Sequence, residues 1–160
     1  MPEDIRLDRK LDDPAVIALL ESHLADMRAI SPPGSVHALD LDALRAQDVR
    51  FWTLWRVAPN TETPALAGCA AIKRLDKDHG EIKSMRTAAA FLRQGVASAL
   101  LVHVIDDAVA MGLTRLSLET GSTEHFASAR TLYATHGFEP CPPFADYLPD
   151  PHSVFMTREL

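Results

Sequence analysis

The stretch from Gly80 to Leu101, GEIKSMRTAAAFLRQGVASALL, is the most informative part of this chain. Its pattern predicts a strand that ends near Thr87, a loop through Phe91, and a helix that opens around Gly95. The first turn of a helix leaves backbone N–H groups unpaired at the positive end of the helix dipole. Because glycine has no side chain, a ligand can approach the backbone closely at this point. The stretch therefore predicts a seat for a phosphate or pyrophosphate group.

Two standard nucleotide-binding motifs are absent from the sequence. A Walker P-loop requires GxxxxGK followed by Ser or Thr, and no glycine of the chain precedes Lys-Ser or Lys-Thr. A Rossmann fingerprint requires GxGxxG, and Gly95 stands alone. Taken by itself, the stretch predicts a phosphate site with a single glycine.

The composition is that of an ordinary globular protein. Of 160 residues, 47% are apolar and 24% charged, which is enough for one domain, residues 1–160, with a substantial core. The net charge of −6 argues against nucleic acid and anionic membranes as partners. No segment approaches the roughly 20 apolar residues of a membrane span, and the N-terminus has no apolar signal core. Cys69 and Cys141 are interpreted as reduced thiols, so we expect a cytoplasmic protein.

Hydrophobic periodicity and turn residues predict the order β-α-α-β-β-β-α-β-α-β-β. This order indicates an α/β fold with a mixed, mostly antiparallel sheet of six to seven strands, flanked by about four helices. Helices are predicted over 14–29, 40–47, 96–111 and 124–136. Strands are predicted over 5–7, 51–57, 65–75, 81–87, 113–120 and 153–158, with another that begins at Phe138 and is interrupted by Pro140.

Two sequence blocks connect these elements to a known family. Residues 92–97 read LRQGVA, close to the pattern Arg/Gln-x-x-Gly-x-Gly/Ala, from which only Leu92 departs. Residues 126–138 read FASARTLYATHGF, close to Asn-x-x-Ala-x-x-Leu-Tyr-x-x-x-Gly-Phe, from which Phe126 departs. Together the two blocks and the predicted order of elements resemble the GNAT superfamily of acetyl-CoA-dependent N-acetyltransferases. The resemblance implies the GNAT fold over nearly the whole chain.

The resemblance also implies a cosubstrate, acetyl-CoA, with its pyrophosphate held mainly by backbone amides and its pantetheine arm beside a strand. The backbone N–H of Met85 is the implied oxyanion donor. The cofactor-binding residues that follow from the match are Met85, Arg86, Thr87, Arg93, Gln94, Gly95, Val96, Ala97, Ser98 and Ser128. We expect no metal, because the seven histidines show neither HExxH nor paired cysteine spacing.

Acetyl transfer to an amine requires that an ammonium lose a proton and that the departing thiolate be stabilised. Tyr133 matches the tyrosine that acts as general acid in many family members; the alternative is a buried, structural tyrosine. Glu81 is the candidate base, because the histone-acetylating branch has a catalytic glutamate at the corresponding place. Its alternative is a strand-end glutamate that is solvated or paired with Lys83. Glu119 is the reserve candidate, as base or as ligand of the substrate ammonium.

The acceptor site is expected between the first two helices and a late loop, by analogy with the family. Ser35 and His37 are candidate substrate ligands on the first side, and the loop 142–152, which carries Tyr147, forms the other. The implied function is acetylation of a primary amine of a small molecule, amino-acid-like or an amine metabolite. The alternatives are a protein lysine or N-terminal acetyltransferase and a non-catalytic CoA-binding or interaction module. A homodimer through the final strands is common in such folds.

Overall fold

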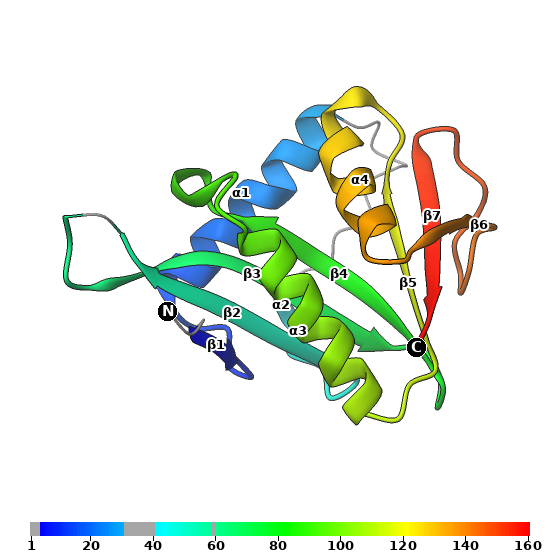
Figure 1. Cartoon of the computed structure of the whole chain (residues 1–160), viewed down its shortest axis with the longest axis horizontal. Coiled ribbons are helices and arrows are strands. Elements are labelled where there is room, and N and C mark those ends of the chain that lie inside the picture. The colour runs from blue at the N-terminus through cyan, green and yellow to red at the C-terminus, as the bar shows by residue number, and fades with distance from the viewer. Residues whose placement is uncertain (1–3, 31–40, 59) are drawn as a thin grey trace.

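The computed structural model describes residues 4–30, 41–58 and 60–160 (Figure 1). A seven-stranded sheet has the order β1-β2-β3-β4-β5-β7-β6, with helices on both faces. The strands are β1 (Asp4–Leu7), β2 (Val49–Val57), β3 (Pro64–Arg74), β4 (His79–Thr87), β5 (Arg115–Gly121), β6 (Glu139–Cys141) and β7 (Ser153–Glu159). The helices are α1 (Pro14–Ile30), α2 (Leu41–Leu44), α3 (Val96–Ala110) and α4 (Ala127–Thr135), with 3₁₀ turns η2 (Ala89–Phe91) and η3 (Glu124–Phe126).

The predicted mixed sheet and the predicted order of elements are confirmed, with three local differences. The helix predicted over 40–47 is shorter, because the chain tightens into turns after Leu44 and β2 begins at Val49. The helix predicted over 124–136 divides into η3 and α4. Pro140 lies within β6 instead of interrupting it. Since β6 is the edge of the sheet and pairs with β7 alone, a residue without an N–H is tolerated there.

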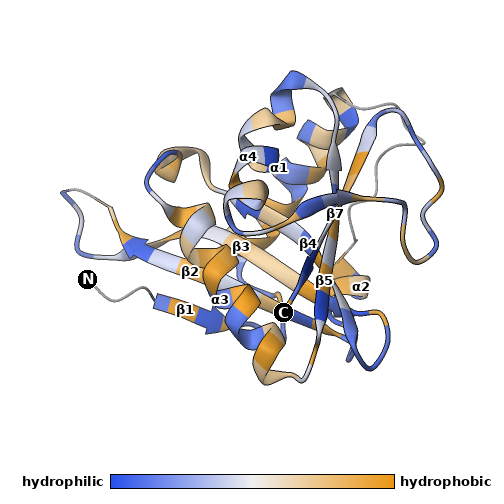
Figure 2. Ribbon diagram, turned by 45° about the vertical axis from the view of Figure 1, so that its right-hand side comes forward, coloured by the Kyte–Doolittle hydropathy of each residue, from blue (hydrophilic) through white to orange (hydrophobic). Residues whose placement is uncertain are grey.

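The two faces of the sheet carry two separate hydrophobic clusters. On one face α3 packs its fully buried stripe, including Val96, Leu100 and Val104, on Trp52 and Ile72. In Figure 2 the apolar colour is concentrated along α3 and β3. On the other face a second cluster joins the start of α1 and α2 to β2 and β3: Leu11, Val16, Leu20, Leu44, Phe51, Cys69 and Ala71. Burial raises the pKa of the Cys69 thiol to about 12, so this cysteine is an unreactive core residue.

A β-bulge in β4 changes which face its side chains reach. Arg86 pairs with Cys69 and Lys83 with Ala71, so two residues of β4, Ser84 and Met85, lie opposite a single residue of β3. Ser84 has a positive φ of 55°. As a result Lys83 and Arg86, three residues apart, both lie on the α1 side of the sheet.

The pairing of β4 with β5 ends early. These two strands are the parallel pair of the sheet, and their register runs from His79–Arg115 only to Ile82–Leu118. Beyond this point β5 continues to Gly121 beside β7, and β4 continues to Thr87 beside β3. The strands therefore diverge, and the backbone of β4 after Ile82 has no β5 partner on that edge. No helix in the described ranges is long and apolar enough to cross a membrane.

Candidate active site

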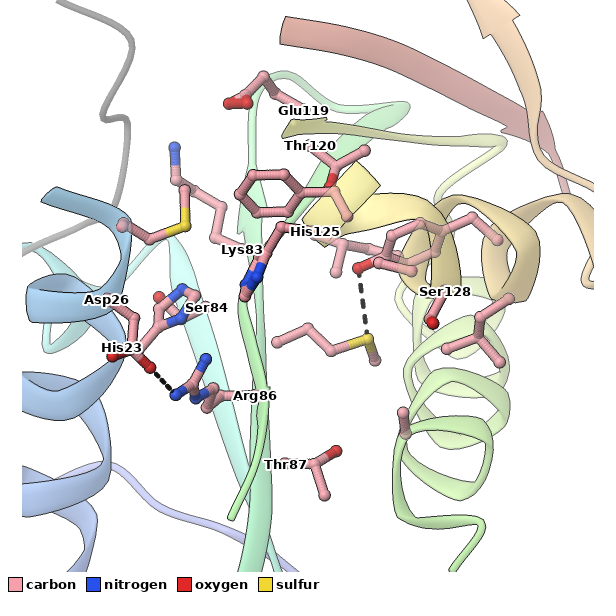
Figure 3. A pocket seen from close by; sticks show the side chains of 18 of the residues that line it. His23, Asp26, Lys83, Ser84, Arg86, Thr87, Glu119, Thr120, His125 and Ser128 are labelled. Atoms are coloured by element: carbon pink, nitrogen blue, oxygen red, sulfur yellow. Dashed lines mark hydrogen bonds and ion pairs between the residues drawn. The ribbon is translucent and has the colours of Figure 1, made fainter. Parts of the chain in front are cut away.

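A cavity of about 500 Å³ lies where β4 and β5 diverge, and Figure 3 shows it from close by. Its wall is drawn from α1, β4, η2, the start of α3, the end of β5, η3, α4 and the loop before β7. The lining residues are His23, Asp26, Met27, Glu81, Ile82, Lys83, Ser84, Met85, Arg86, Thr87, Ala89, Leu92, Ala97, Glu119, Thr120, His125, Phe126, Ser128, Ala129, Leu132, Tyr133 and Tyr147. The cavity thus joins the two predicted catalytic residues, the reserve glutamate and five of the predicted cofactor-binding residues.

The start of α3 forms one end of this site. The N-cap is Gly95, with a φ of +78° and no side-chain cap hydrogen bond, so the first-turn amides of α3 are left for an outside acceptor. Arg93 also has a positive φ, 61°, within the turn that leads into the helix. A Cβ added to Gly95 would meet no heavy atom within 4 Å, so the space before the helix is open. These donors fit an anion such as a pyrophosphate.

The other predicted residues of this loop serve the loop itself or lie beside the cavity. Leu92, which departs from the family pattern, lines the cavity and is 57% exposed. The Gln94 side chain donates to the Ala90 carbonyl, 3.2 Å away, and the Gln94 carbonyl accepts a 2.7 Å bond from Arg56. Val96 is buried in the core, and Ser98 Oγ lies 3.2 Å from His136 Nε2.

Tyr133 reaches the cavity from α4. Its ring packs edge-on against Phe138, and its hydroxyl donates a 3.5 Å hydrogen bond to the thioether sulfur of Met85. A thioether is a weak acceptor, so a better acceptor that enters the cavity can take this donor. Burial raises the pKa of Tyr133 to about 12, with the charge of Glu119 acting in the same direction. The hydroxyl therefore stays protonated at neutral pH.

Glu81 is held in a network on β4. Its carboxylate accepts a 2.5 Å hydrogen bond from the Tyr147 hydroxyl and a 3.2 Å bond from Lys83 Nζ, and its side chain is only 4% exposed. Lys83 also donates to the Tyr147 oxygen at 3.1 Å and lies over the ring of that tyrosine. Burial raises the pKa of Tyr147 above its ordinary value, and Glu81 raises it further.

Glu119 lies near the end of β5, in register with Phe155 of β7. Burial raises its pKa to about 7; the positive charge of Lys83 opposes this rise, whereas the negative charge of Glu81 adds to it. Because Lys83 is already engaged by Glu81 and Tyr147, it offsets the burial of Glu119 only in part. A carboxyl group that titrates near neutral pH inside a cavity is suited to accept a proton.

Several polar residues of the cavity wall were not among the predicted ligands: His23 and Asp26 on α1, Lys83 and Ser84 on β4, Thr120 on β5, and His125 in η3. Asp26 forms an ion pair with Arg86 (Figure 3). Burial lowers the pKa of His23 to about 4, helped by the neighbouring Arg86 charge and opposed by Asp26. The sequence held one signal for His23, since it falls in the otherwise apolar stripe of its helix. Ser35 and His37 lie outside the described residues.

The comparison with known families agrees with this geometry. The family described as "Acetyltransferase (GNAT) family" matches residues 16–138. The chain belongs to the GNAT family. It is therefore an acyltransferase with the mixed α/β fold of that family, as the sequence blocks predicted.

Individual relatives support the same assignment. The chain is 51% identical over 154 residues to an uncharacterised N-acetyltransferase of Bacillus subtilis, YsnE, a match that covers 94% of this chain and 98% of the relative. It is 49% identical to an uncharacterised N-acetyltransferase of Escherichia coli, YedL, over 94% and 93% of the two chains. Among solved structures, a Klebsiella pneumoniae protein described as an acyl-CoA N-acyltransferase superposes with a TM-score of 0.78 at 28% identity, over 99% and 97% of the chains.

Proposed function

We propose that this enzyme transfers the acetyl group of acetyl-CoA to the primary amine of a small molecule, by direct attack of the amine. One observation carries the proposal: Glu119 and Tyr133, a group suited to accept a proton and one suited to donate a hydrogen bond, line the same cavity. They come from different elements, β5 and α4, so that the reacting atoms would lie between them.

Acetyl-CoA, when bound, supplies the acetyl group as a thioester. The first-turn amides of α3 and the turn at Arg93 to Gly95 fit its pyrophosphate. The β4 backbone after Ile82, which has no β5 partner on one edge, fits the amides of its pantetheine arm. Met85, Thr87, Ala97 and Ser128 line this part of the cavity. We propose that the Met85 N–H, within the bulge, stabilises negative charge on the thioester oxygen.

We propose Glu119 as the base. An amine acceptor carries a proton at neutral pH, with a pKa near ~10, and must lose it before its nitrogen can form a bond to the acetyl carbon. A carboxylate with a pKa of about 7 takes that proton more readily than an ordinary glutamate does. Glu81, the first candidate from the sequence, is engaged by Tyr147 and Lys83, which favours a role for it in fixing the wall.

Tyr133 is proposed to act on the leaving sulfur. As the carbon–nitrogen bond forms and the carbon–sulfur bond breaks, negative charge collects on the sulfur. The Tyr133 hydroxyl, protonated at neutral pH and bonded only weakly to Met85, can turn to donate a hydrogen bond to it. Because a phenol with a pKa of about 12 holds its proton more tightly than a thiol does, this hydrogen bond stabilises the thiolate without a complete proton transfer. The thiolate instead takes up the second proton of the nitrogen, which is lost as the amide forms.

The size of the cavity favours a small acceptor over a protein. Its volume of about 500 Å³ is in the range of small-molecule sites, and the cosubstrate's arm would fill part of it. Tyr147 lines one side and is fixed by edge-on and tilted ring contacts with Phe144 and Phe155. Such a fixed aromatic wall limits the length of chain that could lie across the acceptor side. The expected homodimer, the cytoplasmic location, and acceptor contacts from Ser35 and His37 stay predictions.

The test is release of free CoA thiol from acetyl-CoA across a panel of amines, with each product identified by mass spectrometry. The panel includes amino acids, polyamines, aromatic amines, and peptides with a free N-terminus or a lysine. Acetylation of small amines at rates well above those of the peptides is expected. Turnover with the peptides alone would favour a protein acetyltransferase. Tight binding of CoA with no turnover on any amine would favour a non-catalytic module.

A further inference from the structure

We infer that the acceptor carries a carboxylate as well as its amine, as an amino acid does, and that Arg86 binds this carboxylate. The inference rests on the proposed function, because it concerns the acceptor of the same site. It is carried by the environment of Arg86, which the bulge in β4 directs to the α1 side of the cavity.

Arg86 has more hydrogen-bonding capacity than its protein partners use. Its side chain is 27% exposed and lines the cavity. Within the described part of the chain, Nη2 donates to Asp26, whereas Nε is shielded from solvent and has no hydrogen-bond partner. A guanidinium presents five N–H donors in a planar fork, and a carboxylate can accept two of them at once. An acid group in the cavity would therefore complete the coordination of Arg86.

His23 provides a second underused polar group on the same wall. Nδ1 of its ring is buried without a hydrogen-bond partner among the described residues. His23 precedes Asp26 by three residues on α1, so the two side chains share one face of the helix. Buried polar groups in native proteins are seldom left unpaired, and two of them beside one cavity point to a ligand with oxygen atoms.

The other charges of the site are arranged to suit an amine at the opposite end. Figure 3 shows His23, Asp26 and Arg86 together at one side of the pocket, with Glu119 apart from them and Lys83 between. Lys83 is taken up by Glu81 and Tyr147. Among the described residues, Arg86, with its unpaired Nε, is therefore the cation of this wall that is left to bind a carboxylate of the acceptor.

A purely structural role for Arg86, tying β4 to α1 through Asp26, explains less of what is seen. Asp26 is 48% exposed, and water weakens an ion pair in which one partner is so accessible. The ion pair with Asp26 also leaves Nε of Arg86 without a hydrogen-bond partner among the described residues. Recognition of a substrate carboxylate accounts for both features, since it would bring the missing acceptor to a guanidinium that Asp26 already orients.

The experiment compares amino acids with the amines obtained by removing their carboxylate. After a screen of the standard L-amino acids, kcat/KM is measured for pairs such as L-leucine and isopentylamine, L-phenylalanine and phenethylamine, and L-histidine and histamine. The wild-type enzyme should prefer the amino acid of its best pair by about tenfold or more, since hydrogen bonds to charged groups contribute at this level. Arg86→Gln should remove most of this preference, mainly through KM.

The matched control is Arg50→Gln. Arg50 forms a similar ion pair, with Asp107 at 3.0 Å and side chains 38% and 21% exposed, but it does not line the cavity. This variant should keep the preference for the amino acid. Thermal unfolding and CoA binding establish that each variant is folded, and Arg86→Lys, which keeps the charge but lacks the fork, replaces Arg86→Gln if that variant fails to fold.

Two results would overturn the inference while leaving the proposed function intact. One is acetylation of the decarboxylated amines as efficiently as of the amino acids by the wild-type enzyme. The other is a preference for amino acids that survives unchanged in the Arg86 variant. Failure to acetylate any amine of the wider panel would instead remove the proposed function, and the inference with it.

Discussion

Replacement of Glu119 by glutamine should strongly lower the activity of the enzyme and, at the same time, make it more stable above neutral pH. Glu119 is partly exposed on β5, and burial raises its pKa to about 7. In the folded enzyme the carboxylate form is disfavoured by this burial, so ionisation of Glu119 costs free energy that a neutral glutamine does not incur. The Glu119→Gln variant keeps the shape of the side chain and removes this cost.

The magnitude follows from the pKa. A rise from 4.5 to about 7 corresponds to about 3 kcal/mol of unfavourable free energy for the ionised group, at about 1.4 kcal/mol for each pKa unit. Solvent reaches part of the side chain, so we expect about 1–2 kcal/mol in practice. Because the folded-state pKa is raised, the wild-type stability associated with Glu119 is fully present below about pH 4.5 and is lost as the pH rises through about 7.

The assay combines thermal unfolding with steady-state kinetics between pH 5 and 9. At pH 8 the Glu119→Gln variant should unfold about 2–8 °C above the wild type, at about 2–4 °C for each kcal/mol in a chain of this size. At pH 5 the two should unfold at nearly the same temperature. The wild-type kcat/KM should fall as the pH drops through about 7. The variant should have a kcat/KM about 10²- to 10⁴-fold lower and should no longer show this fall.

Glu81→Gln is the control for a glutamate with satisfied partners. Its carboxylate is bonded to Tyr147 and Lys83, so its loss leaves a nearly buried lysine without its anion and should destabilise the fold by about 1–3 kcal/mol. If kcat/KM of Glu81→Gln no longer falls at low pH, whereas kcat/KM of Glu119→Gln still does, the base is Glu81. The measured quantity is the difference in unfolding temperature between Glu119→Gln and the wild type. If this difference is no larger at pH 8 than at pH 5, the reasoning from burial is refuted.

Three other substitutions have defined outcomes. Tyr133→Phe should lower kcat. The CoA affinity measured by calorimetry and the unfolding temperature should change little, because the hydroxyl is bonded only to a thioether. An unchanged kcat would remove Tyr133 from the mechanism. Gly121→Ala should weaken CoA binding, because the new Cβ would lie 1.9 Å from the Phe126 ring and push that side chain, which lines the cavity, aside. Gly68→Ala should lower stability by about 1–3 kcal/mol in denaturant unfolding, because its Cβ would lie 2.8 Å from both the Arg86 carbonyl and Val96; wild-type stability would show that α3 can shift at no cost.

The fold, and the helix start that we propose binds the cosubstrate, could be predicted from the sequence because local patterns specify them. The stripe of α3 repeats at helical spacing, and Gly95 stands before it, so the helix start and its exposed amides follow from a short stretch. The LYATHGF run places Tyr133 on a helix that ends at Thr135, just before Gly137, which has a φ of +89°. Neither feature depends on how distant parts of the chain meet.

The proposed acceptor side depends on such distant contacts. The family resemblance indicated its walls, at the first two helices and the loop 142–152, but the sequence did not single out His23, Asp26 or Arg86 as acceptor ligands. The sequence of the segment Lys83-Ser84-Met85-Arg86 predicts a regular strand, and no residue in it indicates the bulge that directs Arg86 toward α1. Regular alternation would have placed Lys83 and Arg86 on opposite faces. The raised pKa of Glu119 arises from burial, with charges supplied by β4, and Glu81 is engaged by a tyrosine 66 residues later.

The bulge and the divergence of β4 from β5 together explain how one strand can serve both substrates. Met85 turns toward α4, where its sulfur meets Tyr133, whereas Arg86 turns toward α1 and Asp26. The gap that opens after Ile82 connects these two sides. An amine deprotonated by Glu119 would approach the acetyl carbon from the α1 side, and the sulfur would leave toward Tyr133. If this division holds, substitutions at Arg86 should change which amine is preferred and should have little effect on kcat. Substitutions at Tyr133 should lower kcat and have little effect on which amine is preferred.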